Sequence, residues 1–272
     1  MKHCLFFTAR GQGTPTFVLD VGVGGTYQDW LPILENIAQK TLVVAYDRAG
    51  YGQSDKGPFP RNSSRIADEL KKLLDTAKIS GPYILVGHSL GGLNAQIFAL
   101  KYPEDTAGLV LLDPPPLDWI LGDGFPGLKD MFQREVQNLK NTANAAENSE
   151  DQREQNRASY LQTLASEHES LINSSSAVMK SCRNKSWGKL PIYVIASGIP
   201  NQQFGESAAR FQKYWNNQCM GLASRSSRGR YYFSPTSSHH IPQDDPEMVL
   251  DVLEKILSEI KKDSEQYRCL LF

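Results

Sequence analysis

Ser89 stands at the centre of a motif with a specific chemical use. The segment Gly87-His88-Ser89-Leu90-Gly91 matches the pattern G-x-S-x-G, with an apolar run directly before it and a helical run directly after it. A serine on a sharp turn between a strand and a helix projects its hydroxyl from the end of a sheet, and the flanking glycines leave room for close backbone packing. The first amides of the helix also point at this hydroxyl, where they would stabilise a developing oxyanion. The motif therefore predicts a nucleophilic serine.

The elements that would position this serine follow an α/β pattern. Short β-branched, apolar runs alternate with helical periodicity, as expected for a mostly parallel sheet with helices on both faces. The segment Met1–Thr8 predicts a first strand, and the last helix begins near Pro246. The other predicted strands are Thr16–Val21, Thr41–Asp47, Tyr83–His88, Ala107–Asp113, Pro191–Ser197 and Arg230–Ser234. Ser89 follows one of them directly, at the sheet edge where α/β proteins bind their ligands.

This alternation stops between about Pro115 and Lys189. Two apolar stripes there predict helices, for which ordinary packing is a sufficient explanation: Leu128, Met131, Phe132, Val136 and Leu139, then Tyr160, Leu161, Leu164, His168, Leu171 and Ile172. The segment Asn141–Arg157 has no apolar residue larger than alanine, which predicts a solvated helix or a link. We expect residues 114–189 to form a helical cap over the carboxyl end of the sheet, inserted into a core of residues 1–113 and 190–268.

Five blocks of the chain form a series along the sequence. They are Arg10–Leu19, Ala45–Asp55, the Ser89 motif, Gly108–Asp113, and Ser238–Pro242 before Pro246. Together they resemble the α/β-hydrolase superfamily, and the resemblance covers nearly the whole chain. It implies a hydrolase similar to the serine esterases and lipases, in which Ser89 is the nucleophile and His239 is its general base.

A general base must take the proton of Ser89, because serine is a poor nucleophile at its own pKa. Of the five histidines, only His239 and His240 lie between the last predicted strand and the last helix, in the order serine, acid, histidine that the family uses. The spacing to Pro246 matches the family's histidine at His239 better than at His240. His88, inside the motif, is expected to frame the pocket.

The acid departs from the family's usual pattern. Many members carry it after the strand that follows the cap, but the loop Ala196–Glu206 contains no aspartate and has a glutamate only at its end. Other members carry it at the end of the strand that follows the helix after the Ser89 motif, where Asp113 stands. The resemblance favours Asp113 and leaves Glu206 as the alternative acid. The role of the acid would be to hold the tautomer and the orientation of the His239 ring.

Two backbone amides are expected to form the oxyanion hole. One is the N–H of Leu90, directly after the nucleophile. The other lies in the glycine-rich loop Asp20–Thr26, called the oxyanion loop below. The family usually has His-Gly in this loop, whereas this chain has Val21-Gly22, and we expect Val23 to be the second donor. A glycine-rich turn without a catalytic part is the alternative. Because a backbone N–H comes from almost any residue, the missing histidine changes only what orders the loop.

Composition restricts partners and cofactors. A chain of 272 residues allows one large α/β domain, and Lys+Arg 29 against Asp+Glu 30 gives a net charge of −1, which argues against a nucleic-acid partner. No apolar stretch approaches the roughly 18 residues of a transmembrane helix. Gly122–Gly127 matches G-x-G-x-x-G but follows no predicted strand and has a proline where a helix should begin. The chain has no P-loop pattern, and no carboxylate or third histidine stands at ligand spacing from His239 and His240, so we expect neither a cofactor nor a metal.

The cysteines and the C-terminus bear on localisation. Cys4, Cys182, Cys219 and Cys269 lack metal or C-x-x-C spacing, which is typical of free thiols in a reducing compartment. The N-terminal apolar run is shorter than the core of a signal peptide, so a cytoplasmic protein is expected. Residues Cys269–Phe272 form a C-a-a-X box, which predicts a geranylgeranyl group on Cys269 and peripheral membrane attachment. A chance apolar tail is the alternative.

Two classes of function remain open at this point. The first is a cofactor-independent serine hydrolase that cleaves a carboxylic ester of a small or acyl-chain substrate through an acyl-enzyme on Ser89. Thioesterases, lactonases, iminopeptidases and perhydrolases use the same residues, whereas epoxide hydrolases and dehalogenases attack with an aspartate at this position. The second is a ligand- or partner-binding protein on a hydrolase scaffold, which the atypical oxyanion loop supports. The intact serine, histidine and motif favour the enzyme.

Overall fold

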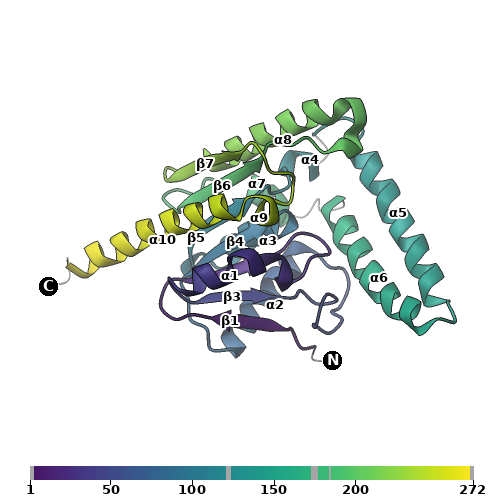
Figure 1. Ribbon diagram of the computed structural model, residues 1–272, viewed down its shortest axis with the longest axis horizontal. Coiled ribbons are helices and arrows are strands. Elements are labelled where there is room, and N and C mark those ends of the chain that lie inside the picture. The colour runs from purple at the N-terminus through teal and green to yellow at the C-terminus, as the bar shows by residue number, and fades with distance from the viewer. Residues whose placement is uncertain (1–2, 121–123, 173–176, 184, 270–272) are drawn as a thin grey trace.

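In the part of the chain that this computed structural model describes, residues 3–120, 124–172, 177–183 and 185–269, seven strands form one sheet (Figure 1). The strands are β1 (Phe7–Arg10), β2 (Thr16–Asp20), β3 (Val43–Tyr46), β4 (Tyr83–His88), β5 (Thr106–Leu112), β6 (Ile192–Ser197) and β7 (Gly229–Ser234). Their order is β1-β3-β2-β4-β5-β6-β7, and β1 pairs antiparallel with β3 while the other described pairs are parallel. The predicted fold class is confirmed.

The strands from β2 to β7 lie where hydrophobic patterning predicts them, each within two residues at either end. β1 differs from the prediction, because it begins at Phe7 and residues 1–2 lie outside the described residues. The N–H groups of Cys4 and Phe6 donate to the side chains of Asp55 and Ser54. The backbone before β1 is therefore bonded to a loop, which delays the start of the strand.

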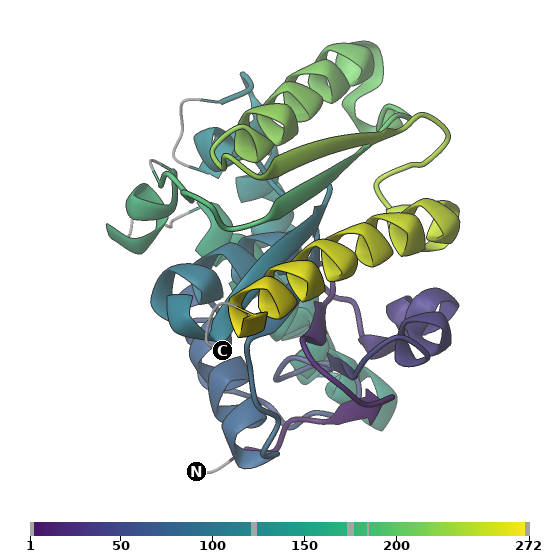
Figure 2. The same ribbon diagram turned by 90° about the vertical axis from the view of Figure 1, so that its left-hand side faces the viewer.

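Helices cover both faces of the sheet. One face carries α2 (Ser63–Thr76), α3 (Leu90–Lys101) and α8 (Ala208–Ala223), and the other carries α1 (Leu31–Ala38) and α10 (Pro246–Cys269). Figure 2 shows α10, in yellow, lying along the strands. Successive residues of β4 serve the two cores, since Leu85 packs with the first set and Val86 with the second. Shorter helical segments are η1 (Tyr27–Trp30), η2 (Pro103–Asp105), η3 (Gln202–Ser207) and α9 (Ile241–Asp244).

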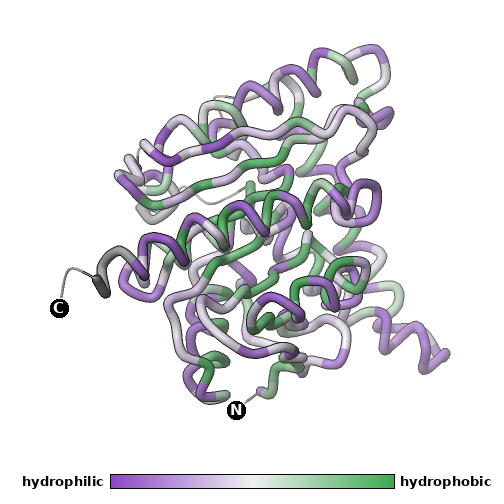
Figure 3. Tube along the Cα trace, turned by 60° about the vertical axis from the view of Figure 1, so that its left-hand side comes forward, coloured by the Kyte–Doolittle hydropathy of each residue, from purple (hydrophilic) through white to green (hydrophobic). Residues whose placement is uncertain are grey.

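The chain between β5 and β6 contains further helices, which the structure describes as α4 (Leu117–Ile120), α5 (Leu128–Glu147), α6 (Gln152–Ile172) and α7 (Ala177–Arg183). α5 and α6 form an antiparallel pair that projects from the sheet, and the outer end of this pair is hydrophilic (Figures 1 and 3). That end contains the segment predicted to be solvated. Ala143 and Ala146 of α5 pack there against Ala158 and Leu161 of α6, and Gln162 donates to Glu147 at 3.0 Å.

The termini and the remaining segments complete the description. None of the helices in the described ranges is long and apolar enough to cross a membrane. α10 carries the chain to Cys269, and residues 270–272 of the C-a-a-X box lie outside the described residues. Residues 122–123 of the rejected glycine pattern also lie outside them.

Candidate active site

Ser89 occupies the turn between β4 and α3. Its backbone has φ 51° and ψ −121°, a conformation that is rare for a residue with a side chain and costs on the order of 1–3 kcal/mol. The Ser89 N–H donates to the carbonyl of Leu112 on β5 at 2.9 Å, which holds the turn against the sheet. A Cβ on Gly87 would overlap the backbone of Gly91, and a Cβ on Gly91 would overlap the backbone of Asp20. Close backbone packing therefore requires both glycines of the motif.

His239 and Asp113 meet at the carboxyl edge of the sheet. His239 lies in the loop after β7, and its Nδ1 donates to Oδ2 of Asp113 at 2.7 Å. Asp113 directly follows β5, is 3% exposed and has a φ of 47°. Because an ionised carboxylate can only accept, Nδ1 of His239 carries the hydrogen of the neutral ring. Nε2 is then the nitrogen that can take a proton.

The end of β6 holds the Asp113 carboxylate from behind. Ser197 donates to it twice, from its N–H to Oδ1 at 3.1 Å and from its hydroxyl to Oδ2 at 2.9 Å. Gln212 of α8 donates in turn to the carbonyl and hydroxyl oxygens of Ser197, at 2.8 and 3.0 Å. In many members of the resembled superfamily the acid follows this strand. Here the strand end instead fixes the direction of Asp113 toward His239.

His88 supports the loop that carries His239. Its Nε2 donates to the backbone carbonyl of His239 at 2.7 Å, and the two rings lie 4.9 Å apart. Burial lowers the pKa of His88 to about 3, and the positive charge that His239 can carry acts in the same direction. His88 is therefore neutral near pH 7, and its proton stays on the nitrogen that bonds the carbonyl. It frames the site, as expected from the sequence.

The structure does not bring the two alternative residues into this cluster. His240 is exposed, heads the short helix α9 and has its ring 6.0 Å from that of His239. Glu206 is exposed on η3, and its side chain makes no hydrogen bond to His239 or to any other residue that the structure describes. Asp113 is the carboxylate that contacts His239.

His88 links the backbone segments that carry Ser89 and His239. Among the residues that the structure describes, none accepts or donates a hydrogen bond with the Ser89 hydroxyl, so Oγ and the His239 ring are not directly bonded. His88 precedes Ser89 in the chain and bonds the backbone of His239. Catalytic hydrogen bonds are often long in the absence of substrate and tighten when it binds.

The loop after β2 lies beside Ser89. A Cβ built on Gly22 would lie 3.4 Å from Cβ of Ser89, in ordinary contact. Within the described part of the chain, no group accepts a hydrogen bond from the N–H of Val23 or of Leu90. These two amides, which are the expected oxyanion-hole donors, are therefore both free to bind a ligand near Ser89.

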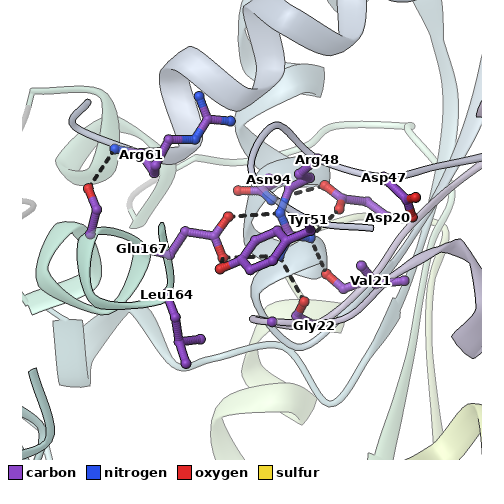
Figure 4. A network of polar contacts seen from close by, with 12 residues as sticks. Asp20, Val21, Gly22, Asp47, Arg48, Tyr51, Arg61, Asn94, Leu164 and Glu167 are labelled. Carbon is purple, nitrogen blue, oxygen red and sulfur yellow. Dashed lines mark hydrogen bonds and ion pairs between the residues drawn. The ribbon is translucent and has the colours of Figure 1, made fainter. Parts of the chain in front are cut away.

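A buried arginine orders this loop in place of the missing histidine. Arg48, in the loop after β3, donates to the carbonyls of Val21 and Gly22 at 2.7 and 2.8 Å. Figure 4 shows its guanidinium between two carboxylates, Asp20 at the end of β2 and Glu167 of α6. Neither Arg48 nor Glu167 is predicted from the sequence as a residue of the site. Arg48 stands inside a block that carries the family resemblance, which was an available signal, whereas Glu167 gives none in the sequence.

Known proteins resemble this chain over different parts of its length. The model of the alpha/beta hydrolase fold family matches residues 15–220. YqjL of Bacillus subtilis (strain 168) is 27% identical over 248 residues, which are 90% of this chain and 85% of YqjL. The (lyso)-N-acylphosphatidylethanolamine lipase of Bos taurus is 32% identical over 96 residues, which are 34% of this chain and only 28% of the lipase.

Solved structures agree with the family match. An esterase from Thermogutta terrifontis superposes with a TM-score of 0.68 at 19% identity, over 94% of this chain and 93% of that one. The enol-lactonase from Burkholderia xenovorans LB400 superposes with a TM-score of 0.64 at 18% identity, over 94% and 97%. At these identities the likeness shows the fold. Because the family model spans most of the sequence, the chain belongs to the alpha/beta hydrolase fold family.

Proposed function

We propose that this protein is a serine hydrolase that cleaves carboxylic esters through an acyl-enzyme on Ser89. The observation that carries the proposal is the bond from Nδ1 of His239 to Asp113, because it leaves Nε2 as the basic nitrogen at the edge where Ser89 stands. A structural ion pair would need neither the strained serine turn nor two free amides beside it.

The first half of the reaction acylates the enzyme. Nε2 of His239 takes the proton of the Ser89 hydroxyl while Oγ attacks the carbonyl carbon of the ester. The carbonyl oxygen becomes an oxyanion, which the N–H groups of Leu90 and Val23 bind. When the tetrahedral intermediate collapses, the carbon–oxygen bond to the alcohol breaks, and His239 returns the proton to the departing oxygen.

The second half releases the acid. His239 takes a proton from water, whose oxygen attacks the acyl carbon, and the imidazolium then protonates Oγ of Ser89 as the carboxylic acid leaves. Asp113 stabilises the imidazolium in both halves without taking its proton. The steps consume one water per ester and need no cofactor.

The substrate class is argued from the nucleophile and from one relative. Ser89 attacks acyl carbons, whereas opening an epoxide in this family needs a carboxylate nucleophile. The relative from Bos taurus is named as a (lyso)-N-acylphosphatidylethanolamine lipase, which supports an acyl substrate. We assign residues 114–189 to a helical cap that holds the acyl or alcohol group.

The test uses purified full-length protein with p-nitrophenyl acetate and with a fluorophosphonate probe. Turnover and labelling at Ser89 are expected, and Ser89→Ala should lose turnover by up to about 10⁶-fold, as loss of the serine does in subtilisin. His239→Gln should lose both readouts, while His240→Gln, at the exposed neighbour, should keep them. Saturable binding of an ester without turnover or labelling would contradict the proposal and favour a binding protein.

A substrate panel then separates the reactions that share these residues. Thioesters, lactones and N-terminal prolyl amides are offered at equal concentration beside acyl esters. The highest kcat/KM is expected for a carboxylic ester, because specificity is set by differential binding of the transition state. A higher kcat/KM for one of the others would replace the ester with that substrate class while keeping the roles of Ser89 and His239.

A further inference from the structure

We propose that Arg48 and Glu167 are positioning residues that aim the N–H of Val23 into the oxyanion hole. Helix α6, which carries Glu167, would then control how well the site stabilises the oxyanion that forms when Ser89 attacks. This inference rests on the proposed function and extends it to residues outside the catalytic cluster. It concerns orientation of a backbone donor, since neither side chain is assigned a contact with substrate.

The Arg48 side chain uses every donor it has. Nε and Nη2 donate to the Glu167 carboxylate at 2.9 and 3.1 Å, and Nη1 donates to Oδ1 of Asp20 at 2.7 Å. The remaining two N–H groups donate to the carbonyls of Val21 and Gly22. A guanidinium has five N–H groups in a fixed planar fork, and here all five have acceptors. The fork therefore has one orientation, and so do the two carbonyls.

Fixing the carbonyl of Gly22 fixes the amide of Val23. The two groups belong to one planar peptide unit, in which a trans bond points C=O and N–H in opposite directions. The Gly22 oxygen accepts from Arg48 at 2.8 Å and from the N–H of Gly25 at 3.2 Å. The N–H of Val23 must therefore point away from Arg48. Donation by a cation to the carbonyl also polarises the peptide and strengthens its N–H as a donor.

Glu167 makes this arrangement depend on α6. Its carboxylate is 1% exposed, accepts twice from Arg48 and accepts once from the hydroxyl of Tyr51 at 3.0 Å. Burial acts to lower the pKa of Arg48, but the charges of Glu167 and Asp20 outweigh it and raise the pKa above its usual value. The guanidinium is thus charged and buried, and removing one carboxylate would leave that charge poorly matched.

One face of α6 contacts the loop after β2 and the loop after β3, which carries Arg48. Tyr160, Thr163 and Glu167 are three and four residues apart and so share a face of the helix. The Tyr160 hydroxyl donates to the carbonyl of Gly24 at 3.4 Å, and a Cβ on Gly50 would overlap the side chain of Thr163. The carbonyls of Gly22 and Gly24, on either side of Val23, are therefore both tied to α6. The order of the oxyanion loop therefore depends on the docking of α6.

The test compares two arginine–glutamate pairs in which the arginine is buried. Glu167→Gln keeps the shape of the side chain but removes its charge and one acceptor oxygen. The matched control is Glu69→Gln, because Glu69 binds Arg61 through two hydrogen bonds at 2.7 and 2.6 Å and Arg61 is also 1% exposed. Arg61 touches α6 as well, since its N–H donates to the Ser166 hydroxyl at 3.0 Å, but it does not contact the oxyanion loop.

We expect Glu167→Gln to lower kcat for p-nitrophenyl acetate by about 10- to 100-fold, below the loss of about 10²- to 10³-fold for a missing oxyanion donor. KM should stay within about threefold, because the ground-state ester gains little from this donor. The apparent pKa of the pH–rate profile should not move, since Asp113 and His239 are unchanged. Phosphonate labelling of Ser89 should slow in parallel with kcat, and Glu69→Gln should keep all four values.

A milder variant guards against loss of folding. Tyr51→Phe removes only the hydroxyl that donates to Glu167, and we expect a smaller loss of kcat, about two- to tenfold, with the same constant KM. A kcat within twofold of the wild type in both folded variants overturns the inference, as does an equal loss in Glu69→Gln. A wild type that neither turns over nor labels overturns the proposed function instead, and the catalytic role of the pair with it.

Discussion

Ser89 and Asp113 share an unusual backbone conformation, since both have a positive φ although neither is glycine. Each is held there by a hydrogen bond from its N–H to the next strand, Ser89 to Leu112 at 2.9 Å and Asp113 to Ile195 at 2.8 Å. The sheet therefore offsets the strain by completing its ladder through both residues. The consequence is that the two side chains leave the strand ends toward the same edge.

The hydrogen bonds of Asp113 predict the effect of removing its charge. In Asp113→Asn the side-chain oxygen must stay where the Ser197 N–H donates, so the amide nitrogen takes the place that faces His239. It would donate to Nδ1 and force the ring proton onto Nε2, which abolishes the base. We expect kcat to fall by about 10⁴-fold with KM nearly unchanged, by analogy with the serine proteases. Steady-state kinetics check this, and near-normal turnover would reassign the acid.

The control for this substitution is the other carboxylate that the sequence allows. Glu206 is exposed and has no hydrogen bond to His239 among the described residues. Glu206→Gln should therefore keep kcat and KM within about twofold, since surface substitutions of this kind have little effect. A loss of activity in Glu206→Gln with retention in Asp113→Asn would reverse the two assignments.

The depressed pKa of His88 predicts a pH dependence of stability. Its folded pKa is about 3 and its ordinary value is 6.5, so between these values the unfolded chain binds a proton that the folded chain does not. The contribution is complete above pH 6.5 and is lost as the pH falls toward 3. Each pH unit in this window removes up to about 1.4 kcal/mol of unfolding free energy.

A variant isolates this contribution from that of the carboxylates. His88→Gln keeps a donor for the His239 carbonyl but does not titrate. The difference in unfolding free energy between wild type and variant, measured by urea denaturation, should fall as the pH is lowered from 6 to 4. A difference that does not change with pH would show that His88 is protonated in the folded protein.

At the residue scale, the sequence predicts what is local and not what is tertiary. Ser89 is visible because its strand, turn and helix are contiguous. The choice between Asp113 and Glu206 depends on which of them reaches His239 in space, and the sequence does not give that distance, since Asp113 lies 126 residues from His239 along the chain and still contacts it. Glu167 resembles a solvated charge on a polar helix until α6 is docked. Its burial is a property of the packed molecule.

At the scale of elements, the strands are predictable because helices cover both faces. Every residue of β2, β3 and β4 is buried, and such strands appear in the sequence as continuous apolar runs. β1 pairs with one neighbour only and is partly exposed, so its run is less regular and its start is predicted too early. The helices between β5 and β6 are predicted as helices, but their direction relative to the sheet depends on the docking of α6.

Substitution by alanine should have opposite effects at two glycines, Gly87 at the turn between β4 and α3 and Gly221 in α8. In Gly87→Ala the new Cβ would overlap backbone atoms of Gly91 and Gly92, which cannot move without opening the turn. We expect a loss of at least about 3 kcal/mol of unfolding free energy, as is typical of severe core or backbone clashes. Gly221 lies in α8 with nothing within 4 Å of a built Cβ.

Gly221→Ala is therefore the matched control for this turn. Alanine in a helix interior is favoured over glycine by roughly 0.5–1 kcal/mol, so this variant should be more stable than the wild type. Thermal and denaturant unfolding of the two variants check both signs. A tolerated Gly87→Ala would contradict the close approach of β4 to α3.

At the scale of the whole molecule, α6 connects a polar surface to the catalytic edge. Its outer end is held by the packing of Ala158 and Leu161 and by an exposed hydrogen bond from Gln162 to Glu147, whereas Glu167, nearer the other end, accepts buried hydrogen bonds from Arg48. The two ends should therefore open with different free energies, because local stability follows buried contacts. Coupling between sites is reciprocal, so a ligand that stabilises the oxyanion loop must also stabilise the docked state of α6.

Amide hydrogen exchange measures this coupling directly. A phosphonate on Ser89 has a tetrahedral phosphorus, and its polar phosphoryl oxygen lies where the oxyanion would form. The adduct should slow exchange in residues 21–26 of the loop and in residues 160–167 of α6, and leave the turn at residues 148–151 unchanged. Ser89→Ala, treated with the same reagent, should show no change anywhere. Protection of the loop without protection of α6 would mean that the oxyanion loop is ordered by Arg48 alone and that α6 only covers it.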